Sequence, residues 1–439
     1  MSAIDPEAPP SLDADSVPED VGNMISYAAN YGNPREVHAA FTWLRANRPV
    51  GKVYTKDFRP YWVVSKQADI LEVERQDSLF LNGARPLILS PAVTQDALER
   101  LGNTAPSGAG KSLVALDGED HRKYRALTQT WFMPPNIKKL EERVRTIARA
   151  HVERMLTRGG RCDFHADVAL HYPIQVIMEI LGLPPEDEPR LLRLTQQLFG
   201  ARDPDLSRSA KAMDDPVAAA AVIRSVIEDF NVYFTQLTLD RRANPRDDVA
   251  SVIANATIDG KLIELADANA YYQILATAGH DTTSGSTAGA IWALAERPDQ
   301  LAKTHANLGL IPSLIEEAIR WVTPVKHFMR TAVEDYELRG RQIKAGDWLL
   351  MSYMSGNRDE DVFEDPFEFR VDRNPNKHVS FGYGAHLCLG MHLARFETRI
   401  LFEELLPRIK SLALDGEPKW AQTNFVSGPK RLPIRFTVA

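Results

Sequence analysis

The sequence predicts one large, mainly α-helical domain with a small β region. Three observations support this prediction. Most segments after about residue 37 repeat apolar side chains at spacings of three and four, which is the period of an amphipathic helix. Only a few short segments alternate apolar and polar residues as strands do. No repeat, low-complexity linker or abrupt change of composition divides the chain, so its 44% apolar residues can form a single core.

The helical pattern is clearest in four segments. The first, residues 132–160, has proline near its start and two glycines at its end, which is the usual asymmetry of helix termini. Residues 163–182 and 215–242 repeat apolar side chains with the same period. The longest run covers about residues 264–297, and Pro298 stops it.

Three other regions favour β-strands, because alternation and β-branched residues replace the helical spacing there. They are residues 60–66, 328–353 and 431–438. The mixture therefore predicts many helices and little sheet.

Composition excludes several classes of function. The formal net charge is −7 at pH 7, so we expect no nucleic-acid partner, because phosphate binding needs a clustered basic surface. The chain has no run of about 18 apolar residues, the length that a membrane-spanning helix needs. Its two cysteines, Cys162 and Cys388, argue against a disulfide framework and favour a reducing cytoplasm. We expect a soluble, cytoplasmic protein that does not contact membranes.

The N-terminus predicts the domain boundary. Residues 1–20 are acidic and proline-rich, without the cationic start or apolar core of a signal peptide. We therefore expect a flexible tail over residues 1–20 and a folded domain over residues 21–439.

The longest helical segment contains residues that weaken a helix. Residues 275–290 read LATAGHDTTSGSTAGA, in which Gly279 costs about 1 kcal/mol relative to alanine. One interpretation is structural: a kink, or a hydroxyl satisfied in the core. The other is functional: Gly279 lets a flat ligand approach the backbone, and Thr282 bonds back to the preceding turn. Asp281 and Thr282 would then form a proton relay. The segment by itself leaves both interpretations open.

A scarce thiol lies in a glycine-rich loop directly before a helical run. The loop is FGYGAHLCLG, residues 381–390, and its thiol is Cys388. Unpaired N–H groups at a helix N-terminus favour a thiolate. A zinc site needs about four ligands, and His386 with Cys388 is too sparse a set. The same histidine is a weak candidate for the base of a nucleophilic cysteine. Haem iron with one thiolate ligand fits this pattern better, and an inert buried cysteine is the structural alternative.

The loop resembles the haem-binding loop of cytochromes P450, F-x-x-G-x-x-x-C-x-G, with every fixed position filled. AGHDTT, residues 278–283, resembles the oxygen-activating segment of that family. Glu317 and Arg320 match its E-x-x-R pair, and Arg373 matches the arginine that completes the triad. The four elements occur in family order, and the likeness covers nearly the whole chain after the tail.

The resemblance implies a P450-type domain with haem b buried between a long distal helix and a proximal cysteine loop. Cys388 would be the metal ligand, an axial thiolate whose charge is tempered by the backbone around Leu389 and Gly390. Thr282 would hydrogen-bond oxygen, and Asp281 would help to deliver protons. The other contacts implied for the haem ring are Ala278, Gly279, Phe381 and Gly390.

The resemblance also assigns the charged residues. The two haem propionates need cationic or donor partners, and the matching family positions are His121, Arg125, Arg330 and His386. Glu317, Arg320 and Arg373 are expected to form a structural network on the proximal side. Cys162 is expected to be an inert core thiol, and His280 occupies a variable family position to which we assign no role.

The implied activity is monooxygenation, in which one atom of O2 enters a C–H bond and the other leaves as water. Because the haem domain uses the whole chain, electrons are expected from a separate iron–sulfur ferredoxin with its reductase. This partner would dock on a basic patch formed by Arg122, Lys123, Lys138, Lys139, Arg143, Lys377 and Arg395. A peroxide-driven enzyme is less expected, because such relatives commonly lack the acid–threonine pair and Asp281 and Thr282 are both present. A haem sensor is also less expected, because the sequence shows no interaction domain beside the haem domain.

Within the family, the sequence is similar to terpineol-hydroxylating P450s over residues 269–284, 323–332, 402–411 and 423–436. This likeness implies a compact hydrophobic substrate, a monoterpenoid or an alkyl or aryl hydrocarbon. P450s that oxidise steroid side chains share other segments, so a larger sterol-like substrate is the alternative. The expected substrate contacts are a lid at residues 84–110 together with Leu275, Ala278, Thr282, Val325, Phe328 and Val426.

Overall fold

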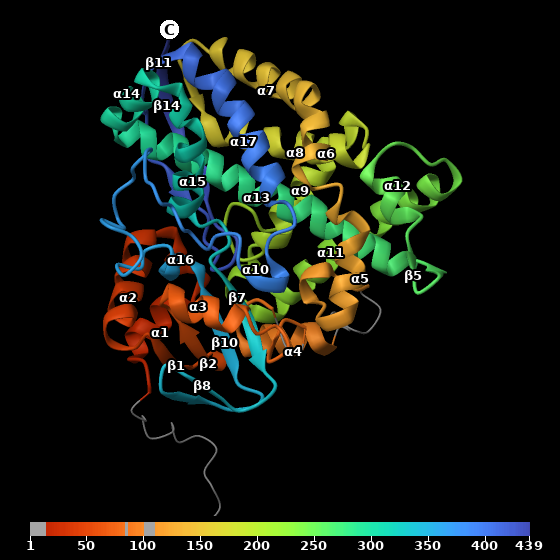
Figure 1. Cartoon of the computed structure of the whole chain (residues 1–439), viewed down its shortest axis with the longest axis vertical. Helices are drawn as coiled ribbons and strands as arrows, with labels where there is room; N and C mark the ends of the chain where they lie inside the picture. The colour runs from red at the N-terminus through yellow and green to blue at the C-terminus, as the bar shows by residue number, and fades with distance from the viewer. Residues whose placement is uncertain (1–14, 84–86, 101–109) are drawn as a thin grey trace, which may run out of the picture.

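The computed structural model describes residues 15–83, 87–100 and 110–439. Figure 1 shows the N-terminal helices and the larger sheet at one end of the molecule and most other helices at the opposite end. The α-helices are α1 Glu19–Ser26, α2 Pro34–Asn47, α3 Gln67–Glu74, α4 Ala92–Arg100, α5 Gly118–Gln129, α6 Pro134–Ile137, α7 Glu141–Leu156, α8 His171–Leu181, α9 Glu188–Phe199, α10 Lys211–Asp214, α11 Pro216–Ala243, α12 Val249–Ala254, α13 Leu265–Glu296, α14 Pro298–Ala306, α15 Ile311–Val322, α16 Tyr353–Gly356 and α17 Met391–Leu405.

The strands form one five-stranded sheet, one three-stranded sheet and three two-stranded ladders within the described residues. The order of the largest sheet is β1-β2-β10-β7-β3, in which only the β2–β10 pair is parallel. The strands are β1 Val50–Thr55, β2 Phe58–Val64, β3 Phe80–Leu81, β4 Arg161–Asp163, β5 Thr257–Ile258, β6 Lys261–Leu262, β7 His327–Ala332, β8 Tyr336–Leu338, β9 Arg341–Ile343, β10 Trp348–Ser352, β11 Ile409–Leu414, β12 Lys419–Trp420, β13 Pro429–Arg431 and β14 Pro433–Val438.

These elements confirm the predicted mainly helical fold with a small β region. Each of the four helical segments forms helix, and each of the three strand regions contributes strands. The expected weak point in the longest helix does not interrupt it, because α13 runs without a break through Gly279. Among the described helices, none combines the length and apolarity that crossing a bilayer requires.

The folded part begins earlier than predicted. Residues 1–14 of the expected tail lie outside the described residues. Val17 is only 2% exposed, and its N–H donates to the carbonyl of Lys52 at 2.9 Å. Helix α1 then begins at Glu19. The tail boundary at residue 20 is therefore corrected, because an apolar side chain and a backbone pair anchor this segment to β1.

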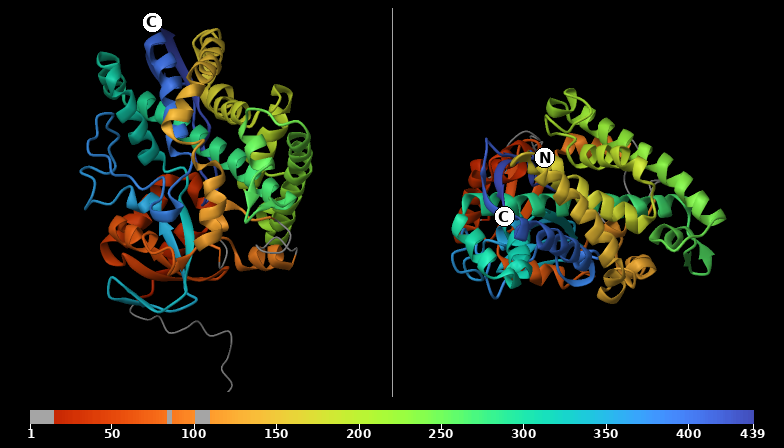
Figure 2. Two further views of the ribbon diagram at one scale, coloured as in Figure 1. Left: turned by 45° about the vertical axis from the view of Figure 1, so that its right-hand side comes forward. Right: turned by 90° about the horizontal axis from the view of Figure 1, so that it is seen from above.

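Helix α13 is the central element of the helical part. It packs against α8, α11 and α15, and Figure 2 shows it crossing the molecule in both views. Small residues allow these close approaches. A Cβ added at Gly279 would lie 2.4 Å from Cδ1 of Ile177 in α8, and one at Gly289 would lie 2.1 Å from Cγ2 of Val322 in α15. The glycines therefore bring neighbouring helices close to α13.

A buried carboxylate organises the segment that precedes the cysteine loop. Glu317 in α15 is fully buried and accepts hydrogen bonds from Arg320 Nε and Nη2, both at 2.7 Å. Arg373 Nε lies 3.1 Å from both carboxylate oxygens, and the N–H of Arg370 donates at 2.9 Å. Burial alone would raise the pKa of Glu317, but the arginines hold it below its ordinary value.

The same network extends to the loop itself. The two arginines donate their remaining N–H groups to backbone carbonyls between residues 357 and 368. The Asn357 side chain donates to Ser380 Oγ at 2.7 Å and accepts from the N–H of Val379 at 2.8 Å. Residues 379 and 380 are thereby fixed directly before the loop. Glu317, Arg320 and Arg373 thus form a buried network, as expected.

We predict that Glu317→Gln lowers the free energy of unfolding by about 3–5 kcal/mol at neutral pH, because it leaves buried guanidinium groups without their counter-charge. The pKa of Glu317 is lowered in the folded state, so its contribution is present above the unfolded pKa. The difference between wild type and variant should therefore shrink as the pH falls below about 4.5. Urea-induced unfolding at several pH values measures this. Asp372→Asn, which removes an exposed ion pair with Lys303, is the control and should change stability little.

Candidate active site

The cysteine loop delivers one sulfur to the N-terminal end of α17. The backbone N–H of Cys388 donates to the carbonyl of Phe381 at 2.9 Å, which closes the loop. Gly384 has φ of +69°, and a Cβ there would lie 2.2 Å from the carbonyl oxygen of Glu74. The backbone N–H groups of Gly390 and Met391 act on the sulfur of Cys388 by lowering its pKa. Gly390 belongs to the backbone that was expected to temper the sulfur's charge, and Met391 directly follows it.

Burial decides the protonation of this thiol. It raises the pKa of Cys388 above the ordinary value, although the N–H of Gly390, Arg125 and Arg395 act in the opposite direction. The N–H groups at the helix terminus therefore favour a thiolate, as expected, but burial outweighs them in the isolated side chain. A bound metal cation would supply the missing positive charge. Cys162, by contrast, lies on β4, and burial raises its pKa to about 12, which agrees with an inert thiol.

A central cavity of about 210 Å³ lies beside this sulfur. It lies between the cysteine loop with α17 on one side and α13 on the other, and β7 contributes to its wall. The structure brings together here nearly all residues that the sequence analysis assigned to cofactor or substrate. These are His121, Arg125, Leu275, Ala278, Gly279, Thr282, Val325, Phe328, Arg330, Phe381, His386, Cys388 and Gly390.

Two histidines and an arginine form one donor-rich part of the cavity wall. The rings of His121 and His386 lie 4.2 Å apart between centroids, and Arg125 Nη2 donates to the carbonyl of Leu387 at 2.7 Å. Burial, then the charges of His386 and Arg125, lower the pKa of His121 to about 4. His386 also faces Asp117, with Nε2 3.8 Å from Oδ1. An anion entering here would meet several hydrogen-bond donors.

Arg330 forms a second donor group on β7. Its Nη2 donates to Glu74 Oε1 at 2.9 Å, and the hydroxyl of Tyr353 also donates to that oxygen. The second oxygen of Glu74, Oε2, is buried without a hydrogen-bond partner. Neither Glu74 nor Tyr353 was expected from the sequence. A glutamate in an amphipathic helix is normally a solvent-facing residue.

The wall formed by α13 confirms one local expectation. The hydroxyl of Thr282 donates to the carbonyl of Ala278, one turn earlier, at 2.7 Å. Gly279 lines the cavity, but the space beside its Cα is taken by Ile177 of α8. A buried carboxyl on α17, Glu397, also lines the cavity and was not foreseen; burial raises its pKa well above the ordinary range.

Two assigned residues do not line the central cavity. Asp281 and Val426 lie instead at a side cavity of about 50 Å³ between α13, α9 and the segment before β13. Val426 forms an antiparallel β-bridge with Val325, but of the two residues only Val325 lines the central cavity. The cavity geometry therefore does not support Val426 as a substrate contact. Of the expected lid, residues 84–86 and 101–109 lie outside the described residues, and the described remainder does not line the central cavity.

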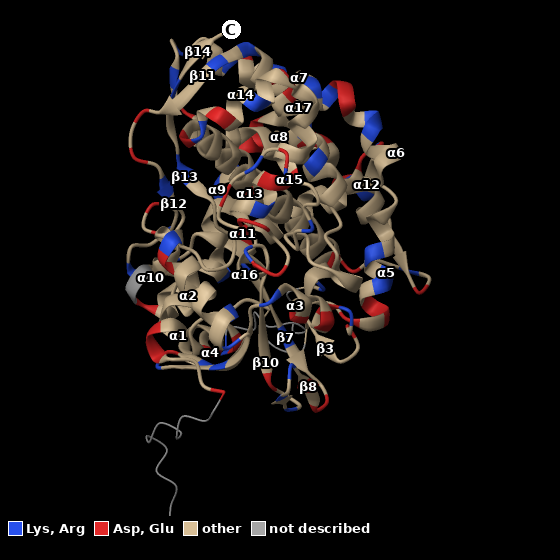
Figure 3. Cartoon of the chain, turned by 60° about the vertical axis from the view of Figure 1, so that its left-hand side comes forward, with Lys and Arg blue, Asp and Glu red and all other residues tan. Residues whose placement is uncertain are grey.

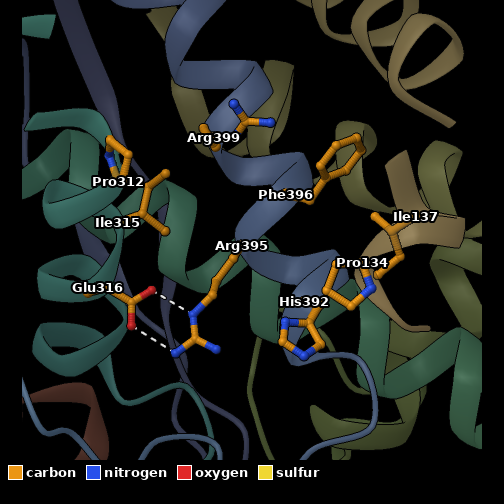
Figure 4. Close-up of a pocket in the computed structure, with 9 residues that line it drawn as sticks. All are labelled: Pro134, Ile137, Pro312, Ile315, Glu316, His392, Arg395, Phe396 and Arg399. Atoms are coloured by element: carbon orange, nitrogen blue, oxygen red, sulfur yellow. Dashed lines mark hydrogen bonds and ion pairs between the residues drawn. The ribbon is translucent and has the colours of Figure 1, made fainter. Parts of the chain in front are cut away.

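A surface pocket of about 230 Å³ lies between α6, α15 and α17. Figure 4 shows Arg395 and Glu316 facing each other across it, with Nε–Oε1 and Nη2–Oε2 distances of 2.6 and 2.8 Å. Arg395 also lies 4.5 Å from the ring centre of Phe381. The pocket is thus linked by one stacked side chain to the cysteine loop. Its other lining residues are Pro134, Ile137, Pro312, Ile315, His392, Phe396 and Arg399.

Comparisons with known proteins agree with this geometry. The family model "Cytochrome P450" matches residues 94–436. The chain is 45% identical to cytochrome P450-terp of a Pseudomonas species, over 97% of this chain and 99% of that one. It is 32% identical to linalool 8-monooxygenase of Pseudomonas putida, over 90% and 95% of the two chains. The crystal structure of CYP108D1 from Novosphingobium aromaticivorans matches with a TM-score of 0.88 and 42% identity, over 97% of this chain and all of that one.

Proposed function

The chain belongs to the cytochrome P450 family and is a P450 monooxygenase with a haem-iron cofactor, and we propose that it hydroxylates a compact, largely hydrocarbon substrate such as a monoterpenoid. The observation that carries this proposal is the central cavity, with one cysteine sulfur on one side and mostly apolar side chains around the rest. Substrate, O2 and a redox partner follow from the family.

The residues around the cavity fit haem b. Cys388 would be the protein ligand of the iron, and a Cβ at Gly390 would stand in open space, which leaves room beside the sulfur. The donor side chains of His121, Arg125 and His386 would hold one propionate region, and Arg330 the other. When bound, the haem iron supplies the centre for O2 activation, and a thiolate ligand favours O–O cleavage.

The two polar residues of α13 would handle protons. Thr282 lines the central cavity, and its hydroxyl can turn from the Ala278 carbonyl to oxygen held there. Asp281 lies at the side cavity, where it can exchange protons with water that enters. We propose that the two neighbours pass protons from the side cavity to the central one.

The substrate class follows from the lining and from one relative. Leu275, Val325 and Phe328 present apolar side chains to the central cavity, and the proposed contacts Ala278 and Thr282 are small. The relative from Pseudomonas putida is a linalool 8-monooxygenase, which acts on a monoterpenoid alcohol. A small substrate with one polar group suits such a wall.

The electron donor would be a small ferredoxin that docks over the surface pocket. Arg395 connects that pocket to Phe381 beside the cysteine loop. Lys138 and Lys139 follow α6 at its edge and are exposed. Figure 3 shows basic segments interspersed with acidic ones along the neighbouring α5 and α7. An acidic partner with an apolar contact residue matches this combination.

Cys388→Ser should abolish the red-shifted Soret band of the reduced, carbon monoxide-treated protein, because a hydroxyl is a poor substitute for an iron-binding thiolate. Cys162→Ser is the matched control and should keep the band, since Cys162 lies on β4. Loss of the band in both variants, or in neither, would contradict the ligand assignment.

Linalool, α-terpineol or p-cymene should convert the ferric haem from low to high spin at lower concentration than cholest-4-en-3-one does. The reason is that a compact ligand fits the apolar wall without moving it. The best ligand is then incubated with ferredoxin, reductase and nicotinamide cofactor, and a hydroxylated product is expected by mass spectrometry. Preference for the steroid would support the alternative substrate class.

Thr282→Ala should lower product formed per nicotinamide consumed by about tenfold or more and raise hydrogen peroxide, because a proton donor is lost. Thr277→Ala is the matched control: its hydroxyl also bonds back along α13, to Gln273 at 2.8 Å, but it does not line the central cavity. Equal coupling in both variants would remove the relay role of Thr282.

The double change Lys138→Gln with Lys139→Gln should slow reduction by ferredoxin about threefold to tenfold at low salt, because it weakens electrostatic steering. The two rates should converge as salt is raised. Lys56→Gln, in the turn between β1 and β2 at the opposite end of the molecule, should have no effect. Stopped-flow spectroscopy measures the rates, and salt-independent reduction would contradict this docking surface.

A further inference from the structure

His280 is a fully buried histidine between Gly279 and Asp281 in α13. It lines neither cavity, yet each ring nitrogen has a polar partner. Nε2 lies 2.8 Å from the carbonyl oxygen of Leu170, directly before α8, and Nδ1 lies 2.9 Å from Thr195 Oγ1 of α9. Nδ1 is also 3.5 Å from Asp281 Oδ2.

These partners determine where the protons lie. The Leu170 carbonyl can only accept, so Nε2 must carry a hydrogen. Thr195 Oγ1 also lies 3.0 Å from the carbonyl oxygen of Leu192, to which its single hydroxyl hydrogen can be donated. With the hydrogen placed there, the hydroxyl accepts from His280, and Nδ1 carries a hydrogen too. A ring that donates from both nitrogens is an imidazolium ion.

The counter-ion of this cation is the neighbouring carboxylate. Asp281 Oδ2 is buried and has no hydrogen-bond partner. The other charged groups nearby already have partners: Glu188 of α9 binds His171 and Gln175, and Lys430 of β13 binds Asp203 and Asp205. His165, before α8, faces the same side cavity, and burial lowers its pKa to about 4, so it stays neutral.

Electrostatics agree with the hydrogen-bond geometry. Burial alone would lower the pKa of His280, but the negative charge of Asp281 and the hydrogen bond to the Leu170 carbonyl raise it above the ordinary value. Because the pKa of His280 is raised, its ring keeps its charge in the folded protein to higher pH than an exposed histidine does.

We infer that His280 is a buried imidazolium that pairs with Asp281 and holds its carboxylate at the side cavity, as a positioning residue of the proton relay. This inference rests on the proposed function of Asp281. Ser284 also faces the side cavity, and its Oγ lacks a partner, so the cavity offers water at least two polar atoms. A proton from bulk solvent, relayed through that water, which is left unchanged, is taken up at Oδ2. It neutralises the carboxylate, ends the ion pair and frees the side chain to turn toward Thr282.

The protonation state can be read directly. The chain has 11 histidines, so histidine labelled with ¹³C and ¹⁵N gives few imidazole signals. In the diamagnetic ferrous carbon monoxide form at about pH 8, above the ordinary histidine pKa, the His280 signal should have both nitrogens protonated. His280→Gln identifies it by its absence, and Asp281→Asn should convert it to a neutral ring. A singly protonated His280 in the unsubstituted protein overturns the inference, since Thr195 would then be the donor.

Turnover separates a positioning role from a structural one. With the best monoterpenoid of the screen, His280→Gln should lower product formation about tenfold, while the ligand-induced spin shift keeps its midpoint. His165→Gln, a buried histidine at the same side cavity, should retain activity.

The double variant of His280→Gln and Asp281→Asn should be no slower than Asp281→Asn alone, because His280 acts through Asp281. A further loss in the double variant would contradict the positioning role. Normal turnover of Asp281→Asn would instead remove the relay, and the imidazole signal would still decide the charge of His280.

Discussion

The Glu317 carboxylate is the constraint on which the proximal side depends. It is buried with two guanidinium groups, and such a cluster is stable only while every charge has its partners. Because the arginines also hold backbone carbonyls between residues 357 and 368, the chain there has little freedom. Asn357 then fixes Ser380, and the cysteine loop begins at the next residue. One carboxylate thus determines, through a chain of hydrogen bonds, where the sulfur of Cys388 lies.

Helix α13 separates two environments with different tasks. Its Thr282 face lines the larger, mostly apolar cavity, and its Asp281 face meets a small polar one. Residues of α13 line both cavities, so this helix lies between them. Under the proposed roles, an apolar substrate and the proton supply would approach the same reacting centre from different sides of the helix. This arrangement suits the oxidation of a compact monoterpenoid, because the hydrocarbon substrate is kept apart from the water that would supply protons.

The ionisable groups around the central cavity fall into two sets. Burial raises the pKa of Cys388 and of Glu397, which favours the neutral form of both side chains as long as no metal cation is bound. The donor groups gather elsewhere on the wall, at Arg125 with its two histidines and at Arg330 with Glu74. A flat cofactor with a metal centre and two anionic groups matches that arrangement of sulfur and donors.

The sequence by itself determined the long helix, the strand regions and the cysteine loop, because each is specified by a local pattern of spacing and residue type. The Glu317 triad came instead from the resemblance to the family, since Arg373 lies 56 residues from Glu317 in the chain. Family motifs likewise brought nearly every assigned cavity residue to the correct wall. Only the tertiary structure decided that Asp281 and Thr282 face different cavities, since neighbours on a helix point about 100° apart and the surrounding helices set what each one meets. It also decided the contacts of His280, whose partners Thr195 and Leu170 are 85 and 110 residues away in the chain. No local pattern specifies contacts over that distance; they arise when α8, α9 and α13 pack.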